Sequence, residues 1–205
     1  MLEALRRDGI VTVGQMPHWA AVKGFLDKRK RWPGHTKAMP ADWAECYSME
    51  DCMRAPGFLD FARQFSPLAA EYFGEASILW SLNAFWTQPE TVRTPRWKYI
   101  NAFHRDAEAP KILTLFFFLT DVGEDGAHVF LKGTQCGAEQ GEEFTIAGPA
   151  GTAFLADTRG LHFGRKPAKP RLIAWARWAN VWPQPSQGLP RIKAPIHELV
   201  VSAPS

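Results

Sequence analysis

Residues 112–119 read ILTLFFFL, and residues 120–126, which follow them directly, read TDVGEDG. The first run is apolar at every position except Thr114, so a β-strand built from it would be apolar on both faces. Such a strand has to be covered on both sides, which places it in the middle of a sheet. The Gly and Asp residues that come next are typical of a turn. This stretch therefore predicts a sheet that is buried on both faces.

Other short apolar or alternating runs lie around this central strand, and Gly, Pro, Asp or Asn residues separate most of them. Many short strands at such spacing favour a sandwich or a barrel. We therefore expect a mainly β fold with N-terminal helices packed outside it. The expected strands are 78–86, 97–103, 112–119, 129–131, 143–146, 152–155 and 171–178.

Helix signals are concentrated before residue 75. Ser48 followed by Asp51 resembles a capping box, so a helix is expected to begin there. Ser66-Pro67 can start another helix, which Gly74 would end. We expect one domain over 1–205, consisting of a helical cover (1–75), a β core (76–180) and an irregular C-terminal tail (181–205).

Composition excludes several classes of protein. Hydrophobic residues make up 46% of the chain, with nine Trp and fourteen Phe, which is enough for a packed aromatic interior and argues against disorder. The net charge of +3 is too small to indicate a nucleic-acid-binding protein. We find neither a signal peptide nor a membrane span at the N-terminus. The three cysteines lack metal-ligand spacing and suggest reduced thiols in a cytoplasmic protein.

Three residues form a candidate metal site. His104 and Asp106 stand two positions apart, and side chains with that spacing point to one face of an extended strand. A distant strand would have to bring His162 to them. Two imidazoles and one carboxylate suit non-haem Fe(II) and leave coordination positions open. A His-x-Asp tripeptide alone is a weak signal, and a single histidine is more often hydrogen-bonded than metal-bound.

The order of these residues and of the strands around them resembles the phytanoyl-CoA dioxygenase family of Fe(II)/2-oxoglutarate-dependent oxygenases. The similar segments cover about half of the chain in the family's order, and they are 103–106 (FHRD), 112–126, 130–134 (FLKGT) and 160–171. The resemblance implies a double-stranded β-helix, which is a cupin-like jelly roll, with the metal at its open end. It also implies a small-molecule substrate.

By this resemblance, His104, Asp106 and His162 would be the iron ligands. Arg171 matches the position that holds the distal carboxylate of 2-oxoglutarate, and a planar guanidinium can grip a carboxylate through two parallel hydrogen bonds. Phe116 matches an aromatic position that flanks 2-oxoglutarate, although it can also be simple core. The implied cofactors are Fe(II), 2-oxoglutarate and O2. The implied reaction oxidises a C–H bond, by hydroxylation or otherwise, and releases succinate and CO2.

Two departures from the family pattern affect the substrate. The family often has Gly-Ser-His where this chain has residues 133–135, GTQ, so any substrate contact of that histidine is absent or replaced. The substrate therefore cannot be carried over from the family's name. Asp106 is intact, which argues against the related halogenases, where a small residue takes its place. Asn83, Trp86, Lys98 and Asn101 are candidates for substrate contact, although structural roles are expected more often.

Two other functions stay open. Arg171 and Arg177 have the spacing of an arginine pair in nucleic-acid dealkylating dioxygenases, but the interval from His162 to Arg171 is shorter here and the modest charge disfavours phosphate binding. A non-enzymatic jelly-roll binding protein is the other, and the intact triad argues against it. We expect Arg177 to be exposed to solvent and His128 to be a hydrogen-bonded strand histidine. The oligomeric state cannot be predicted.

Overall fold

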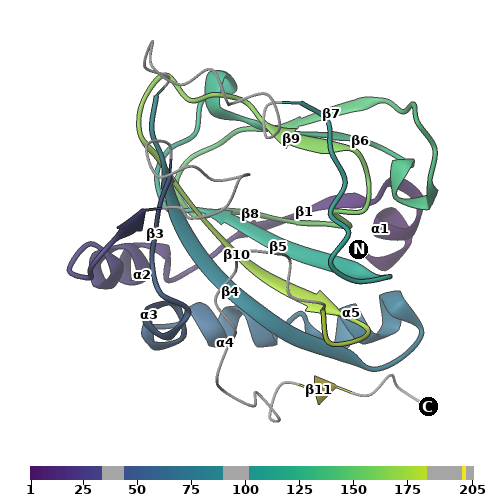
Figure 1. Cartoon of the computed structure of the whole chain (residues 1–205), viewed down its shortest axis with the longest axis horizontal. Coiled ribbons are helices and arrows are strands. Elements are labelled where there is room, and N and C mark those ends of the chain that lie inside the picture. Colours follow the sequence, from purple (N-terminus) through teal and green to yellow (C-terminus); the bar gives the residue numbers. More distant parts are fainter. Residues whose placement is uncertain (34–43, 90–101, 184–199, 202–205) are drawn as a thin grey trace.

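Two antiparallel sheets face each other in a computed structural model that describes residues 1–33, 44–89, 102–183 and 200–201. The larger sheet has the strand order β1-β8-β5-β10-β4-β3-β2, with β11 also paired to β4, and the smaller sheet has the order β7-β6-β9. The smaller sheet lies over one face of the larger one, and helices lie along the other (Figure 1). This arrangement is that of the predicted double-stranded β-helix.

The strands of the larger sheet are β1 (Ile10–Gln15), β2 (Trp32–Pro33), β3 (Ala44–Cys46), β4 (Ser77–Thr87), β5 (Ile112–Phe118), β8 (Thr152–Ala156), β10 (Arg171–Ala179) and β11 (Val200–Val201). Those of the smaller sheet are β6 (His128–Leu131), β7 (Glu143–Ile146) and β9 (His162–Gly164). The α-helices are α1 (Leu2–Asp8), α2 (Trp19–Leu26), α3 (Met49–Arg54), α4 (Phe58–Arg63) and α5 (Ser66–Phe73). Two 3-10 turns are η2 (Glu124–Gly126) and η3 (Thr134–Cys136).

The apolar run that predicts a central strand forms β5. All seven of its residues are buried, and it pairs with β10 on one side and β8 on the other. Phe117 faces the helices, where Phe58 of α4 packs edge-on against it with ring centroids 4.8 Å apart. Phe116 and Phe118 face the interior between the two sheets. The prediction of a strand covered on both faces is confirmed.

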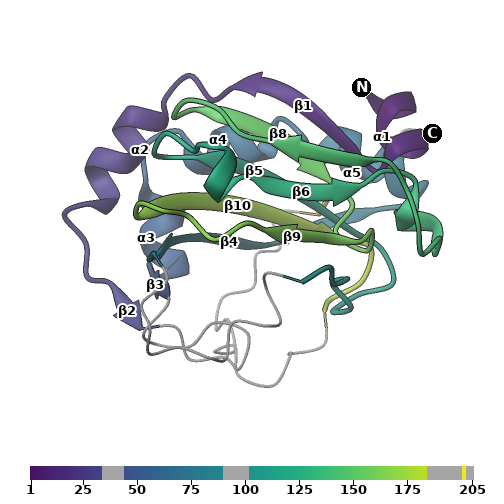
Figure 2. The same ribbon diagram turned by 90° about the horizontal axis from the view of Figure 1, so that it is seen from above.

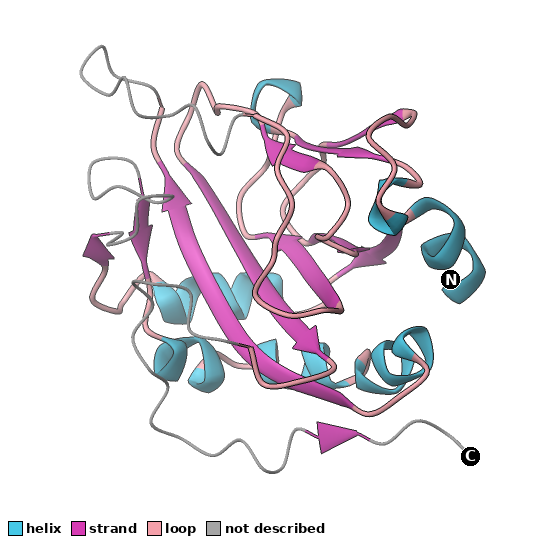
Figure 3. Cartoon of the chain, turned by 45° about the vertical axis from the view of Figure 1, so that its right-hand side comes forward, coloured by secondary structure: helices cyan, strands magenta, loops and turns pink. Residues whose placement is uncertain are grey.

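The helices lie on the outer side of the long strands, as Figure 2 and Figure 3 show from two further directions. The capping signals in the sequence fix two of them. Ser48 caps α3 by accepting a hydrogen bond from the backbone N–H of Asp51 at 3.0 Å. Helix α5 begins at Ser66 with Pro67 in its first turn, and it ends before Gly74, whose φ of 69° is left-handed. None of the helices in the described ranges is long and apolar enough to cross a membrane.

The N-terminal region also contributes strands, which its sequence pattern does not predict. β1 pairs with β8 at one edge of the larger sheet, and β3 pairs with β4 at the other. Both are short and interrupted by polar residues, so their strand character depends on pairing with neighbours rather than on a local pattern. β11 pairs with β4 although it comes from the segment expected to be irregular. The expected strand 97–103 lies largely outside the described residues, and the single-domain organisation stays a prediction.

Candidate metal centre

His104, Asp106 and His162 lie together as the sequence predicts. One possible ligand atom from each side chain lies within 4.8 Å of those of the other two. No other group of this kind occurs in the part of the chain that the structure describes. Two imidazole nitrogens and one carboxylate oxygen are a donor set that suits Fe(II) and leaves part of the coordination sphere for other ligands. The residues present therefore fit a mononuclear iron site.

Backbone pairing brings the two halves of this site together. His104 and His162 form an isolated antiparallel bridge in which each N–H donates to the other's carbonyl at 3.1 Å. The backbone N–H of Asp106 donates to the carbonyl of Thr158 at 2.8 Å. We expected His104 and Asp106 on a regular strand, and the structure instead has an extended segment with a single bridge to β9. The consequence is the same, because both side chains still turn toward His162.

Each of the two candidate ligand histidines is oriented by a backbone carbonyl. Nδ1 of His104 lies 3.0 Å from the carbonyl of Ala102, and Nδ1 of His162 lies 2.9 Å from that of Gly160. A carbonyl oxygen can only accept, so Nδ1 must carry the proton in both rings. Nε2 is then left as the nitrogen with a free lone pair. Such hydrogen bonds fix the tautomer and direction of metal-binding histidines, and nothing in the sequence identified these partners.

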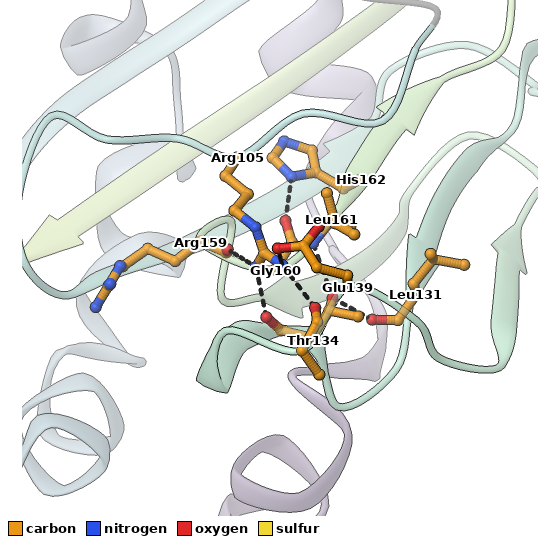
Figure 4. Close-up of polar contacts among 9 residues, drawn as sticks. Arg105, Leu131, Thr134, Glu139, Arg159, Gly160, Leu161 and His162 are labelled. Carbon is orange, nitrogen blue, oxygen red and sulfur yellow. Dashed lines mark hydrogen bonds and ion pairs between the residues drawn. The ribbon is translucent and has the colours of Figure 1, made fainter.

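Arg105, which separates two of the candidate ligands, anchors the segment from the other side (Figure 4). Its guanidinium donates to the carbonyls of Thr134, Ala138 and Arg159 at 2.5, 2.6 and 2.7 Å. The hydroxyl of Thr134 in turn accepts from the backbone N–H of Leu161 at 2.8 Å. Arg105 and Thr134 thus connect the segment that holds His104 and Asp106 to the turn that leads into His162.

Gln135 stands where the resembled family often has a histidine, and it does not point to the metal site. Its Nε2 donates to the carbonyl of Arg6 at 3.0 Å, and the side chain is buried. This hydrogen bond holds the C-terminal end of α1 against η3. Residue 135 therefore has a structural contact in this protein.

Arg177 contradicts the expectation of solvent exposure. It is buried, and its guanidinium forms ion pairs with Asp106 and with Glu108, the latter at 3.2 Å. The guanidinium carbon also lies 5.7 and 5.4 Å from the ring centroids of Trp80 and Trp175. Burial tends to raise the pKa of Asp106, but the positive charge of Arg177, together with the nearby His162 and His104 and a hydrogen bond from Thr158, outweighs it, and the pKa of this carboxyl lies below its usual value. Sequence parity alone could place Arg177 on this face but could not show its partners.

Arg171 is also buried, at the opposite end of β10, but its surroundings differ. Its Nε donates to the hydroxyl of Thr87 at 3.3 Å, and its Nη1 donates to the carbonyl of Gly126. No carboxylate of the described residues forms an ion pair with it. Burial lowers the pKa of this guanidinium to about 10, with Asp125 acting weakly in the other direction. Arg171 is therefore a desolvated cation that no carboxylate of the described residues contacts directly, with Asp125 acting on it only at a distance.

Aromatic rings cover the interior between the metal site and Arg171. Phe116 is buried and stacks on Phe154 with centroids 5.0 Å apart. His128, on β6, lies 4.9 Å from the ring of Phe116 and 5.6 Å from that of His162. Phe116 accordingly lines the interior and also belongs to its apolar core.

His128 does not behave as the sequence predicts. It lies on a strand as expected, but its buried Nε2 has no hydrogen-bond partner among the residues that the structure describes. Burial, together with the nearby charges of His162 and Arg171, lowers its pKa well below the usual value for histidine. The ring is therefore neutral at physiological pH.

The four candidate substrate residues have different outcomes. Asn83 lies on β4 opposite Trp175 and is half-buried. Trp86 belongs to the outer face, where its Nε1 donates to the hydroxyl of Tyr47 at 3.0 Å, so it does not reach the site. Lys98 and Asn101 lie outside the described residues.

Comparisons with known proteins agree with this architecture. No protein-family model matches the chain, and no curated protein matches its sequence. Among solved structures, the non-heme alpha ketoglutarate dependent carbocyclase SnoK from nogalamycin biosynthesis has a TM-score of 0.62 and 17% identity, over 86% of this chain and 81% of that one. The epimerase SnoN in complex with Fe3+, alpha ketoglutarate and nogalamycin RO has a TM-score of 0.59 and 17% identity, over 87% and 82%.

A third similar structure is HygX from Streptomyces hygroscopicus with nickel, 2-oxoglutarate and hygromycin B bound. Its TM-score is 0.63 at 12% identity, over 88% of this chain and 86% of that one. At such low identity, these likenesses establish the fold. The chain therefore has the double-stranded β-helix fold of non-heme, 2-oxoglutarate-dependent enzymes, and the predicted fold class is confirmed.

Proposed function

We propose that the protein is an Fe(II)- and 2-oxoglutarate-dependent dioxygenase that oxidises a C–H bond of a small organic substrate and releases succinate and CO2. One observation carries this proposal. A facial-triad donor set and a buried, unpaired guanidinium lie in the same interior of the fold. The first fits Fe(II), and the second requires an anion.

His104, Asp106 and His162 would hold the iron. Arg177 would keep the carboxylate of Asp106 ionised and would engage one of its oxygens, which leaves the other for the metal. The backbone carbonyls behind the two histidines would keep their Nε2 atoms directed inward.

Arg171 would hold the distal carboxylate of 2-oxoglutarate. Burying a charge without a counter-charge costs on the order of several kcal/mol. A buried arginine is therefore normally paired. Thr87 and Gly126 fix the direction of the guanidinium without neutralising it. A dicarboxylate co-substrate would supply the missing charge.

Iron with bound 2-oxoglutarate would supply the oxidising power for a reaction with O2, and the protein would supply position and exclusion of water. Phe116, Phe154 and Trp175 form an apolar wall near the site, which restricts access of solvent. The intact Asp106 supports hydroxylation or a related oxidation over halogenation. Membership of the phytanoyl-CoA dioxygenase family is part of this proposal and rests on the sequence resemblance.

The substrate is proposed to be a small molecule rather than nucleic acid. HygX and SnoN are complexed with hygromycin B and nogalamycin RO, respectively, and support this class. In the dealkylase alternative, Arg177 would have to share in binding at the site. Here two carboxylates already engage it, which disfavours that alternative. The three free cysteines fit the cytoplasmic location that we propose.

The test is an anaerobic titration of the purified protein with Fe(II) and 2-oxoglutarate, monitored for the visible charge-transfer band of an iron chelate. We expect a band in the wild type and none in the His104→Ala variant, whose iron content should also fall. Absence of the band in the wild type, with iron content unchanged by His104→Ala, would refute the proposal. Succinate release across lipids, acyl thioesters, amino acids and small natural products would then identify the substrate class.

A further inference from the structure

His128 is a polar side chain in an apolar part of the interior, and no described residue forms a hydrogen bond with its Nε2. The residue is 5% exposed. Its ring is surrounded by those of Phe116, Phe154 and His162. Leaving a buried polar group unpaired is destabilising, so a phenylalanine or leucine would pack there at lower cost. The imidazole nitrogen therefore indicates a partner that is not part of the described chain.

The strand pairing of the smaller sheet shows where that partner would lie. His128 stands directly opposite Gly164, and His162 stands opposite Phe130, on the same two strands. Directly opposed residues and residues two apart share one face of a sheet. His128, Gly164 and the candidate iron ligand His162 are therefore on one face, which is the inner one because these rings contact Phe116 and Phe154.

Arg171 reaches this face next to His128. A Cβ added to Gly164 would lie 3.2 Å from Nη2 of Arg171, so the guanidinium lies against this glycine. Two residues along a strand span roughly 6.5 Å, which is the separation along β9 between the metal ligand and the residue beneath the arginine. This span is comparable with the extent of a five-carbon dicarboxylate. His128 is across the ladder from the arginine end of the span.

We propose that His128 is a second binding residue for the distal carboxylate of the 2-oxo dicarboxylate, beside Arg171, and that its imidazole Nε2–H donates a hydrogen bond to that carboxylate. This inference rests on the proposed function and deepens it. A histidine ring carries at least one N–H donor in either protonation state, and the unpartnered Nε2 of His128 is the nitrogen that remains for this hydrogen bond. Arg171 would then neutralise the carboxylate, while His128 would fill one of its remaining acceptor positions. The specificity for a dicarboxylate over a monocarboxylate would come from both residues.

The experiment compares wild type with His128→Phe, His128→Gln and His128→Asn in anaerobic titrations of the Fe(II)-loaded protein. Phenylalanine keeps the ring packing and removes both nitrogens. The glutamine amide can replace the donor at Nε2, and the asparagine amide can replace it only near Nδ1. His18→Phe, which removes an exposed histidine outside the site, is the matched control. The readouts are iron content, thermal melting temperature, and affinity for 2-oxoglutarate and for pyruvate, which lacks the distal carboxylate.

We expect His128→Phe to weaken 2-oxoglutarate binding by about tenfold or more, as loss of a hydrogen bond to a charged group implies. Iron content and pyruvate affinity should stay at the wild-type level. His128→Gln should recover most of the affinity for 2-oxoglutarate. His128→Asn should bind it as weakly as His128→Phe does. The control His18→Phe should bind it as tightly as wild type. Glutamine serves as a second probe if phenylalanine impairs folding.

Two results would overturn the inference while leaving the proposed function intact. In the first, wild type shows the charge-transfer band, and His128→Phe binds 2-oxoglutarate as tightly as wild type. In the second, iron content, pyruvate and 2-oxoglutarate affinity all fall together, which would mean that His128 acts by packing against His162. If wild type itself shows no band, the proposed function fails, which is a separate outcome.

Discussion

The two ends of β10 each carry a buried arginine on the inner face of the sheet, and their surroundings are opposite. Arg177 is paired with Asp106 and Glu108, and indole rings lie beside it. Arg171 has a hydroxyl and a carbonyl as partners and no carboxylate in the described chain. The same residue type on the same strand therefore serves two purposes. A charge that the protein neutralises itself holds a site in place, and a charge that it leaves open is available to a ligand.

This comparison makes a strong prediction about stability. Arg177→Met would leave two largely buried carboxylates, with side chains 15% and 18% exposed, without their cation. Loss of one partner of a buried ion pair destabilises proteins by about 3–5 kcal/mol, and we expect the lower part of this range. Arg171→Met, on the same strand and face, removes an unpaired buried charge and should leave the free energy of unfolding unchanged or increased. Denaturant unfolding of both variants in metal-free buffer measures the difference. Equal destabilisation by the two substitutions would show that the pairing is not what distinguishes them.

Ligand binding should show the reverse order. We expect Arg171→Met to weaken 2-oxoglutarate binding by about 100-fold, because a bidentate, charge-assisted hydrogen bond to the distal carboxylate is lost. Arg171→Lys keeps the charge but loses the planar fork, and it should recover only part of the affinity. Anaerobic titration of the Fe(II)-loaded variants, with iron content as control, measures this. An unchanged affinity in Arg171→Met would remove Arg171 from the co-substrate site.

A third arginine, Arg105, tests whether hydrogen bonds that hold the ligand-bearing segment in place also affect metal binding. Arg105→Met removes the hydrogen bonds to the carbonyls of Thr134, Ala138 and Arg159. Mutation of residues that support metal ligands typically lowers metal affinity by about 10–100-fold. We therefore expect Fe(II) binding to weaken by that factor in Arg105→Met. Arg165→Met, which removes an arginine paired with Glu124 and Glu143 away from the ligands, is the control. Equal iron affinity in both variants would contradict the anchoring role.

Sequence reasoning predicted the elements of this site better than its contacts. The apolar run at 112–119 was enough to place β5 centrally, because a strand without a polar face has to be covered twice. The grouping of the three candidate iron ligands, His104, Asp106 and His162, followed from spacing, order and family resemblance. The orienting carbonyls of Ala102 and Gly160 did not, since every residue has a carbonyl and only the fold selects which ones are close. Strand β1 was missed for the same reason, because it depends on β8 as a partner.

Arg177 and His128 show the limit more sharply. Arg177 is six residues beyond Arg171, so in a regular strand the two side chains share one face of the sheet. This spacing does not show how deeply a side chain is buried, and Arg177 is buried where we expect exposure. The signal that could have corrected it is Glu108, a second carboxylate just beyond Asp106, which makes a buried cation tolerable. For His128, a strand position predicted a hydrogen bond that the described chain does not provide. A buried polar group without a hydrogen-bond partner cannot be predicted from sequence, because its lack of a partner depends on the positions of all the side chains and backbone groups around it.

The comparison of paired and unpaired charges extends to two buried carboxyls. Asp106 has Arg177 beside it, and its pKa is lowered. Asp157 accepts hydrogen bonds from the hydroxyl of Tyr72 at 2.8 Å and the backbone N–H of Arg159 at 3.0 Å, but it forms no ion pair with any described residue. Burial therefore raises its pKa to about 6, and its hydrogen bonds only partly oppose this.

The smallest of the expected effects follows from Asp157. A carboxyl whose folded pKa is above its unfolded value of about 3.9 stabilises the fold fully below that pH, and this contribution is lost as pH rises through the folded pKa. Stability should therefore fall by about 1–2 kcal/mol between roughly pH 4 and pH 6. Asp157→Asn cannot ionise and should flatten this part of the profile. Unfolding free energies across this range decide it, and the same pH slope in wild type and Asp157→Asn would show that Asp157 ionises in the folded protein without a penalty.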